Sequence, residues 1–311
     1  MQLDHILAAV VEPQDKQQPV LDRAQRVARA SGAELVLFHA VFDSALSGRP
    51  LLDNTRLARA RGELVARRTH ELERHARALR KGGLSVDTHV VWEEPAYESI
   101  IRAAIRENAD LVVAGPHTPT RTVVPFSLRQ TDWQLLRFCP RPLLMVRTAQ
   151  ERSGGIVVAL DPTHANDKPA SLDAALLDAA SVLAQQLDVE LYAVHSVSDA
   201  AYPLGSSKNA QAAIRDRLRK KLQREVKKHG APATVHLLRG RPERSIVEFA
   251  AQHDAQLIVM GAISRRGLKR FAVGDTAERL IDAAPCDLLI IKPKNFKLVL
   301  GRSKRERIIL P

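Results

Sequence analysis

The sequence predicts an α/β protein with two tandem doubly wound domains, each with a mostly parallel five-stranded sheet flanked by helices. Three observations predict it. At 311 residues, the chain is longer than a single core usually grows before it splits. Short apolar runs rich in Val and Ile alternate with helical patterns, as expected of parallel strands covered on both faces. The whole series occurs twice.

The internal repeat is the strongest of these signals. Four apolar runs recur in the same order at offsets between 145 and 156 residues: 5–10 with 155–160, 34–39 with 190–195, 111–115 with 257–261, and 143–146 with 288–291. A more polar strand fits residues 86–92 in the first half and 234–238 in the second. The repeat predicts three equivalent pairs: Ile6 with Ile156, His39 with His195, and Gly115 with Gly261.

Helical patterns fill the gaps between the predicted strands. Apolar residues recur at three- and four-residue intervals in 20–30, 100–105, 174–187 and 246–251, and an Arg-rich helix is expected over 54–80. A polar linker that ends in glycine, residues 148–154, separates the halves. We therefore expect domain one at 1–152 and domain two at 153–311, the latter ending in a basic tail.

Composition favours a cytoplasmic globular protein. Hydrophobic residues make up 45% and charged residues 26% of the chain. No apolar run approaches the roughly 20 residues that span a bilayer, and the first residues lack the features of a signal peptide. Cys139 and Cys286 are expected to be inert buried thiols, and the eleven histidines show no metal-ligand spacing.

The net charge of +12 is compatible with binding to an anionic partner such as nucleic acid. Aromatic residues make up only 4% of the chain, so no base-stacking motif accompanies the charge. Charged helix surfaces that face solvent are the simpler explanation of this excess positive charge. We expect nucleic-acid binding, if present, to be weak, sensitive to salt and independent of sequence.

In an open parallel sheet the ligand crevice lies beyond the carboxyl ends of the strands. In domain two, four residues follow or close successive strands: Asp161, Ser196, Gly240 and Gly261. A stretch with glycines, hydroxyl and basic residues then leads to 274–276, which open a helix. Such a stretch favours an anion or phosphate cradle at the helix start.

Two segments carry a family resemblance. Residues 257–293, LIVMGAISRRGLKRFAVGDTAERLIDAAPCDLLIIKP, resemble the C-terminal signature of the universal stress protein family. Residues 131–147, TDWQLLRFCPRPLLMVR, are similar to the N-terminal repeat of that family's tandem members. The resemblance covers nearly the whole chain, apart from the basic tail after Phe296. It implies a protein of the stress response.

The resemblance also implies a position for ATP. The family's ATP-binding members have Gly, two residues, Gly, nine residues, and Gly followed by Ser or Thr. Here the same positions hold Gly261, Ser264, Gly274 and Asp275, so two of the four depart from the pattern. Thr276 substitutes for the missing hydroxyl if the turn shifts by one residue.

Three further positions match the family's site. The resemblance implies contact of Asp161 with the ribose region and of the backbone at Ser196 with adenine, and Gly240 matches the glycine before the third helix. Domain one departs further, because Val11 stands in the place of Asp161 and Glu93 in the place of Gly240. Glu12 lies beside Val11, and no glycine follows Gly115 before the domain ends. We therefore expect domain one to be a degenerate partner.

The leading hypothesis is a binding protein that holds an adenine nucleotide, ATP or AMP, or another small ligand in domain two without efficient turnover. Mg²⁺ would accompany a triphosphate. No catalytic residue and no protein metal site is predicted. One alternative is a weak ATPase switch in which Asp275 coordinates Mg²⁺. The other is an interaction module with vestigial sites, whose basic surface contacts nucleic acid or protein.

The two last strands, 143–146 and 288–291, are expected to pair and form the family's dimer within one chain. The sequence leaves open whether two copies of the chain also form a homodimer.

Overall fold

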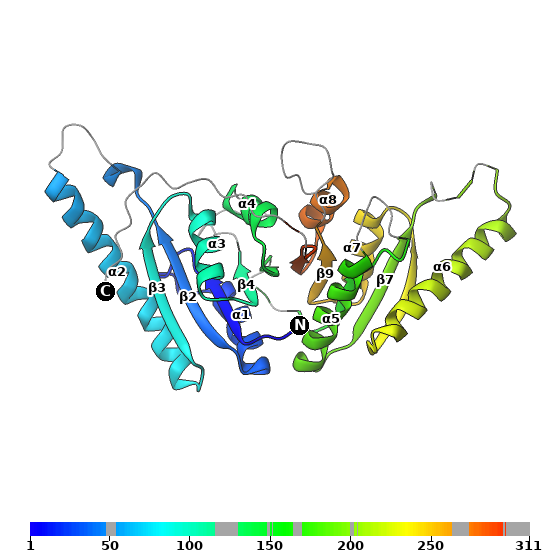
Figure 1. Ribbon diagram of the computed structural model, residues 1–311, viewed down its shortest axis with the longest axis horizontal. Coiled ribbons are helices and arrows are strands. Elements are labelled where there is room, and N and C mark those ends of the chain that lie inside the picture. The colour runs from blue at the N-terminus through cyan, green and yellow to red at the C-terminus, as the bar shows by residue number, and fades with distance from the viewer. Residues whose placement is uncertain are drawn as a thin grey trace. The chain divides into compact units, whose positions relative to one another are not determined.

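The protein folds into two compact units, shown as ribbons in Figure 1: an N-terminal unit, Gln2–Arg141, and a C-terminal unit, Pro142–Phe296 with Met1. The computed structural model describes residues 1–47, 54–115, 130–147, 150, 152–163, 170–199, 202–203, 205–262, 274–294 and 296. Each unit is an α/β fold with a mostly parallel sheet, so the predicted fold class is confirmed.

The N-terminal unit contains four parallel strands in the order β3-β2-β1-β4. Its elements are β1 (His5–Ala9), α1 (Pro19–Ser31), β2 (Glu34–Val41), the 3₁₀ helix η1 (Ser44–Leu46), α2 (Asn54–Lys81), β3 (Val86–Trp92), α3 (Ala96–Arg106), β4 (Leu111–Ala114) and α4 (Gln130–Phe138). The reversal of strand order beside β1 is the feature that opens a crevice in doubly wound sheets.

The C-terminal unit has the strand order β5-β10-β9-β6-β7-β8. Its elements are β5 (Leu143–Met145), β6 (Ile156–Ala159), α5 (Ala170–Leu187), β7 (Leu191–Val197), α6 (Lys208–Lys228), β8 (Ala233–Arg239), α7 (Pro242–Gln252), β9 (Leu257–Gly261), α8 (Asp275–Ala283) and β10 (Asp287–Ile291). The pairs from β10 to β8 are parallel, and β5 alone runs antiparallel to its neighbour.

Strand register confirms the internal repeat. Ile6 of β1 lies opposite Leu35 of β2 and Leu111 of β4. Ile156 of β6 lies opposite Leu191 of β7 and Leu257 of β9, at the offsets that the sequence predicts. Gly115 directly follows β4 and Gly261 closes β9, so the two glycines end corresponding strands.

Strand β5 comes from the first half of the sequence but packs in the C-terminal unit. It pairs with β10 through Leu143 with Ile290, Leu144 with Leu289, and Met145 with Leu288. This is the expected pairing of the two last strands. Beyond it, the Arg147 amide donates to Asp287 Oδ1 at 2.7 Å, and Arg147 Nη2 donates to the Asp282 carbonyl at 3.0 Å. These bonds anchor the end of β5 to β10 and to α8.

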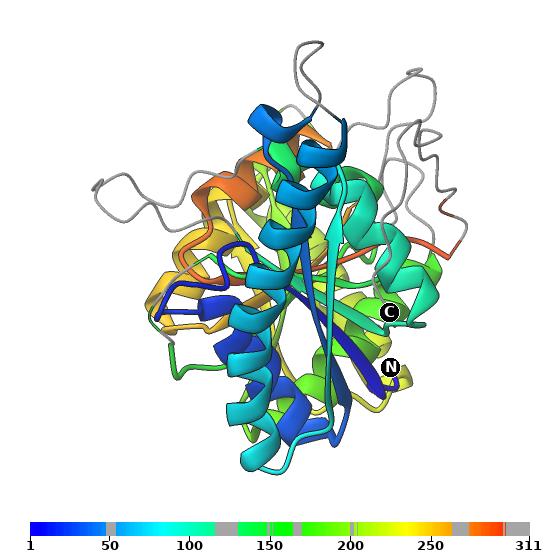
Figure 2. The same ribbon diagram turned by 90° about the vertical axis from the view of Figure 1, so that its left-hand side faces the viewer.

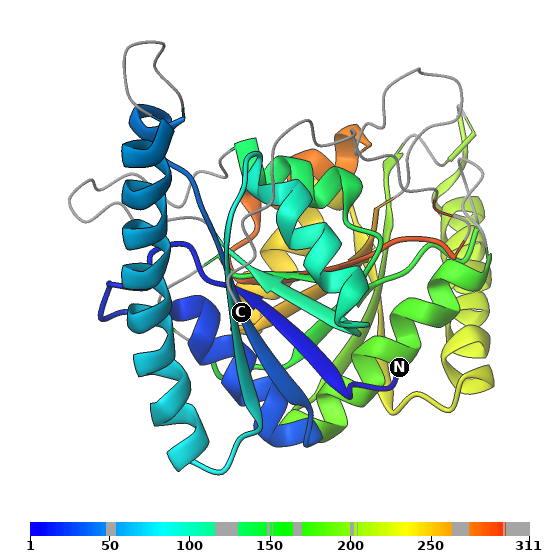
Figure 3. The same ribbon diagram turned by 60° about the vertical axis from the view of Figure 1, so that its left-hand side comes forward.

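Helices cover both faces of each sheet. Right-handed crossovers place α1 and α2 on one face of the N-terminal sheet and α3 with α4 on the other (Figures 2 and 3). The central strands β1, β2 and β4 are mostly buried, with Leu7, Leu37, Val112 and Val113 at 0% exposure, whereas the edge strand β3 is largely half-exposed. Within the described ranges, none of the helices has the length and apolar character needed to cross a membrane.

Candidate functional site: crevices at the carboxyl ends of the strands

The strand-end histidines make the same contact in both units. His39 Nδ1 lies 2.8 Å from the Val10 carbonyl oxygen, and His195 Nδ1 lies 2.9 Å from the Leu160 carbonyl oxygen. Each ring therefore ties the second strand of its sheet to the residue that follows the first strand. This shared bond agrees with a structural role for the pair.

In the C-terminal unit, four predicted site residues lie at one edge of the sheet. Asp161 follows β6, Ser196 is the penultimate residue of β7, Gly240 follows β8, and Gly261 closes β9. Val158 pairs with Ala193 and with Val259, so these strands end at the same level. The structure therefore brings Asp161, Ser196, Gly240 and Gly261 to the edge where ligands bind in this class of fold.

The turn after β8 is held by hydroxyl groups. Ser196 Oγ donates to the Gly240 carbonyl at 2.9 Å and lies 2.5 Å from Ser245 Oγ. Gly240 has a φ of +115°, a conformation that a residue with a side chain rarely adopts. The Ser196 hydroxyl thus fixes the turn, which leaves the backbone of this segment as the surface for a ligand.

The Asp161 carboxylate is oriented by its own loop. Asp161 Oδ1 accepts hydrogen bonds from the Thr163 amide at 3.1 Å and from the Thr163 hydroxyl. The Asp161 amide donates to Asp173 Oδ1 of α5 at 3.3 Å. These bonds restrain the turn and the Asp161 carboxylate at the carboxyl end of β6.

The remaining predicted residues concern the phosphate loop. Ser264 lies outside the described residues. Gly274 is the N-cap of α8 and no side chain caps that helix start, so the first backbone amides of α8 lack an intrahelical partner. Asp275 is the first residue of α8 and Thr276 is exposed. Their position at a helix start suits contact with an anion.

A cavity in the N-terminal unit was not predicted from the sequence. It has a volume of about 530 Å³ and is lined by residues of β1, β2, the loop after β3, α3 and α4. This size lies within the range of small-molecule sites. It occupies the carboxyl ends of β1 and β2, the edge that corresponds to the predicted site of the other unit.

The walls of this cavity are acidic. Among the described residues, its lining includes the carboxylates of Glu12, Glu93, Glu94 and Asp132 together with the guanidinium of Arg68. Asp132 is only 4% exposed. Sequence comparison of the repeats had drawn attention to Glu12 and Glu93 but missed Glu94 and Asp132.

An ion-pair network stands behind the cavity wall. Arg102 Nη1 lies 2.5 Å from Glu93 Oε1, and Arg102 Nη2 lies 2.6 Å from Glu98 Oε2. The Tyr97 hydroxyl donates to Glu98 Oε1 at 3.1 Å. Burial, and then the hydrogen bond to Glu98, raise the pKa of Tyr97, so this lining residue remains a neutral phenol.

One difference between the repeats could have drawn attention to the cavity. Residues 130–138 form α4 and residues 275–283 form α8, so the helices match at an offset of 145. At that offset the acidic Asp132 corresponds to Ala277. An acid on one repeat and a small apolar residue on the other mark a position at which the repeats differ in chemistry.

Metal binding has little support among the described side chains. Within the ranges that the structure covers, no group of three or more His, Cys, Asp or Glu side chains could hold a metal ion. The described residues thus form a set of strand ends and backbone turns in the C-terminal unit, and a cavity partly lined by carboxylates in the N-terminal unit.

Comparison with known proteins identifies the fold's relatives. The family model described as "Universal stress protein family" matches residues 2–147 and again 155–292. The chain belongs to the universal stress protein family. Both repeats are universal stress protein domains, and the resemblance noted in the sequence is confirmed.

Individual relatives agree with this assignment. Universal stress protein E of Photorhabdus laumondii is 28% identical over 311 residues, which cover 96% of this chain and 98% of the relative. The crystal structure of a putative universal stress protein from Pseudomonas aeruginosa UCBPP-PA14 matches with 26% identity and a TM-score of 0.71, covering 94% of each chain. The universal stress protein of Archaeoglobus fulgidus in complex with dAMP matches 45% of this chain and 98% of its own, with 26% identity and a TM-score of 0.33.

Proposed function

We propose that the C-terminal unit of this universal stress protein binds an adenine nucleotide and does not turn it over efficiently. The observation that carries the proposal is the placement of Asp161, the Ser196–Gly240 turn and Gly261 at one sheet edge. These positions match those of the family's nucleotide site, where the resemblance implies ribose contact at Asp161, adenine contact at Ser196 and phosphate contact at Gly261. A ribose hydroxyl would donate to the restrained carboxylate of Asp161.

Two features favour a phosphate in the same crevice. The start of α8 offers backbone amides without a capping side chain. Arg241, which begins the turn into α7, adds positive charge at the end of β8. Asp275 opposes the phosphate, and the nucleotide therefore binds with lower affinity than at a helix start with a hydroxyl residue in that place.

The described side chains at this sheet edge support the proposed lack of efficient turnover. Ser196 and Ser245 contact each other and backbone carbonyls, and the described part of the crevice places no histidine within their hydrogen bonds. His195 Nδ1 is engaged by the Leu160 carbonyl oxygen. A nucleophile activated by a general base is therefore not assembled by these residues.

Calorimetry on the full chain tests the proposal. Asp161→Ala should weaken AMP binding about tenfold or more, because a charge-assisted hydrogen bond contributes roughly 1.5 to 3 kcal/mol. Glu12→Gln, in the corresponding loop of the other repeat, is the matched control and should leave AMP affinity unchanged. Asp275→Ser should raise affinity for ATP more than affinity for adenosine, because it removes a like charge beside the phosphates. AMP binding that Glu12→Gln weakens and Asp161→Ala spares contradicts the proposal.

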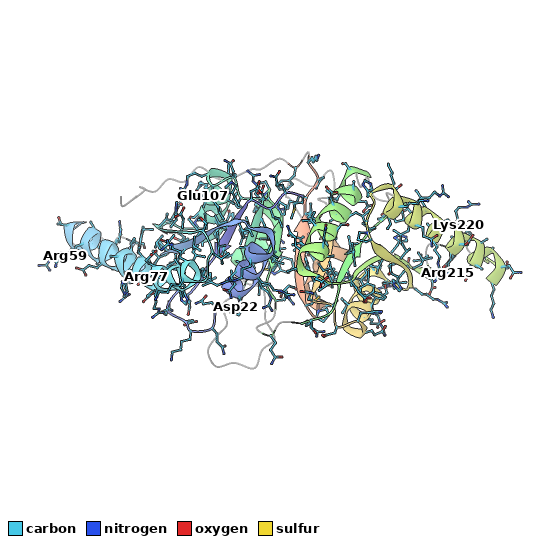
Figure 4. All side chains as sticks on the ribbon, turned by 90° about the horizontal axis from the view of Figure 1, so that it is seen from below. Asp22, Arg59, Arg77, Glu107, Arg215 and Lys220 are labelled. Carbon is cyan, nitrogen blue, oxygen red and sulfur yellow. The ribbon has the colours of Figure 1, made fainter. Side chains whose placement is uncertain are left out.

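A second function is favoured by the distribution of charge. Helix α2 carries nine Lys and Arg residues against three Glu, and α6 carries nine against two acidic residues. Together these two helices hold a net charge of +13, slightly more than the +12 of the whole chain. Arg59 and Arg77 project from α2, and Lys220 from α6 (Figure 4). One helix of each repeat is thus a strongly basic surface element.

The two basic helices differ in how their charge is compensated. On α2, Arg59 pairs with Glu63, and Arg77 and Arg80 both pair with Glu73. On α6, Arg217, Arg224 and Lys227 are exposed and recur at helical spacing on one stripe. We propose that the stripe on α6 contacts nucleic acid weakly and without sequence preference.

Salt dependence of nucleic-acid binding tests this second function. Affinity for a random-sequence duplex should fall steeply as salt rises, because neutralising phosphates releases counterions. The triple change of Arg217, Arg224 and Lys227 to Gln should abolish the binding, and the same change at Arg59, Arg77 and Arg80 of α2 should reduce it less. Sequence-specific binding that survives high salt would contradict the proposal.

A further inference from the structure

We propose that the outer face of helix α2 is a docking surface for an acidic α-helix of a partner protein. Figure 2 shows α2 on the outer side of the N-terminal unit, where it faces the viewer along its length. Exposed cations form a line on this face, which we call the α2 stripe: Arg56, Arg59, Arg67, Arg74, Arg77 and Lys81. The surface is separate from the nucleotide site and from the cations of α6.

The α2 stripe follows the axis of the helix. At 3.6 residues per turn, its six side chains fall within an arc of about 80°. From Arg56 to Lys81 the line is about 37 Å long, at a rise of 1.5 Å per residue. Val65, Leu72 and Ala76 lie on the opposite face, which packs against β2 and β3, and they are 4%, 0% and 0% exposed. Packing therefore uses one face of α2 and leaves the stripe in solvent.

The nine basic side chains of α2 divide into two groups by their contacts. Arg61 and Arg80 each donate Nε–H to a backbone carbonyl, of η1 and of β3, at 2.8 Å, and Arg68 donates to a glutamine side chain of the loop after β1. These three hold the helix to its surroundings. In the α2 stripe, Arg59 and Arg77 pair only with acids of α2 itself, among the residues that the structure describes.

The other four cations of the α2 stripe are exposed, and their side chains make no hydrogen bond or ion pair with any described residue: Arg56, Arg67, Arg74 and Lys81. The described fold thus makes no use of these charges.

The order of charges along the α2 stripe is unfavourable for the helix alone. Arg74, Arg77 and Lys81 follow one another at intervals of three and four residues, so like charges are neighbours on one face. Like charges at this spacing destabilise a helix, whereas acids alternating with bases stabilise it. On this face only Glu63 supplies a carboxylate, and it pairs with Arg59. Carboxylates of a partner that face the stripe would remove this repulsion, which is why we infer an acidic partner.

The spacing of the α2 stripe favours a helical partner. Arg67, Arg74 and Lys81 stand seven residues apart, and a second row with the same period runs from Arg56 to Arg77. A seven-residue repeat winds around a straight helix as a left-handed line, and a second helix can follow that line at a crossing angle of about 20°. Acids with the same period on the partner would each lie opposite a cation, as charged flanking residues do in coiled coils.

Nucleic acid fits this face less well. Helix α2 contains no Phe, Tyr or Trp on which a base could stack. The carboxylate of Glu63 interrupts the α2 stripe, whereas a phosphate backbone presents its charges without a break. A partner helix can place a neutral or basic side chain opposite Glu63.

The test uses two stapled helical peptides of Glu and Ala with the same composition. In the aligned peptide, the glutamates recur at alternating intervals of three and four residues; in the other, they are spread around the helix. Fluorescence anisotropy with the full chain at low salt should show the aligned peptide binding about ten times tighter, and its affinity should fall as salt rises. Arg67→Gln with Arg74→Gln should weaken it about fivefold or more. Arg217→Gln with Arg224→Gln, at equally exposed positions on α6, is the matched control and should change it less than about twofold.

A third probe, random-sequence duplex DNA, separates the two classes of partner. The double change on α2 should weaken duplex binding less than the double change on α6, and a larger loss from α2 would assign the stripe to nucleic acid instead. Failure of the aligned peptide to bind, equal affinity for the two peptides, or equal losses from the α2 and α6 changes would each overturn the proposal. None of these outcomes depends on whether the C-terminal unit binds nucleotide.

Discussion

Single buried groups show how local surroundings set the chemistry of this chain. Cys286 precedes β10 and is 1% exposed. Burial first, and then the negative charge of the adjacent Asp287, raise the pKa of the Cys286 thiol to about 12. The thiolate is the reactive form of cysteine, so the neutral thiol at this position is unreactive. The sequence alone predicted inert cysteines, and burial gives the physical reason.

We expect Cys286 to resist alkylation in the folded protein. In a Cys139→Ala background, iodoacetamide at about pH 8 should label Cys286 only after guanidinium chloride unfolds the chain, because a thiol of such high pKa forms almost no thiolate. The reciprocal Cys286→Ala variant reports on Cys139, whose Sγ lies 3.6 Å from the Arg141 carbonyl oxygen. Rapid labelling of Cys286 under native conditions would contradict the account.

At the scale of elements, the spacing of apolar residues predicted the strands and helices, because burial of strands on both faces and of helices on one face requires apolar side chains at regular positions. The strand predicted at 86–92 is β3, Val86–Trp92, and the helix predicted at 54–80 is α2, Asn54–Lys81. The cavity did not follow, because it depends on how side chains from β1, β2, α3 and α4 pack together. Asp132 on α4 is an example, because its position in a cavity wall depends on tertiary packing that apolar spacing does not encode.

The pairing of β5 with β10 gives a prediction for stability. Leu144 is 6% exposed and lies opposite Leu289. Leu144→Asp buries an unpaired carboxylate and should lower the free energy of unfolding of the C-terminal unit by about 3 kcal/mol or more. Ile105→Asp, at a side chain that is 41% exposed, is the matched control and should change it by less than about 1 kcal/mol. Denaturant unfolding measures both, and equal effects would show that β5 does not stabilise the unit.

A histidine cluster joins four elements of the C-terminal unit. The ring of His236 on β8 lies 4.8 Å from that of Phe249 on α7, and Tyr192 of β7 contacts both. The ring of His253, the C-cap of α7, stacks on that of Phe249 with the ring centroids 3.9 Å apart. Burial first, and then the charges of His253 and of Arg219 on α6, lower the pKa of His236. The cluster therefore favours neutral His236.

This lowered pKa predicts loss of stability on acidification. The unfolded chain binds the proton at the ordinary histidine pKa of 6.5, whereas folded His236 binds it only at lower pH. Stability is therefore full above pH 6.5 and falls as pH drops below it. His236→Phe should flatten this dependence in urea unfolding, and His70→Asn, at an exposed position on α2, should not. An unchanged pH profile in His236→Phe would contradict the stated cause.

On the scale of the whole molecule, the two repeats share a fold and differ in the chemistry of their crevices. Ile6 and Ile156 occupy the same register, yet the strand ends carry acids in one repeat and Asp161 with glycine turns in the other. Sequence reasoning found the repeat, the family and the strand-end residues of the C-terminal unit. It read the N-terminal crevice as lost because the expected phosphate loop was missing there, although a cavity of about 530 Å³ remains.

The most direct measurement of this account is native mass spectrometry of the full chain with AMP added. We expect a complex that holds one molecule of AMP. Asp161→Ala should remove the AMP, and Glu12→Gln, in the corresponding loop of the other repeat, should leave it bound. Retention of AMP by Asp161→Ala together with its loss in Glu12→Gln would contradict the assignment of the nucleotide to the C-terminal unit.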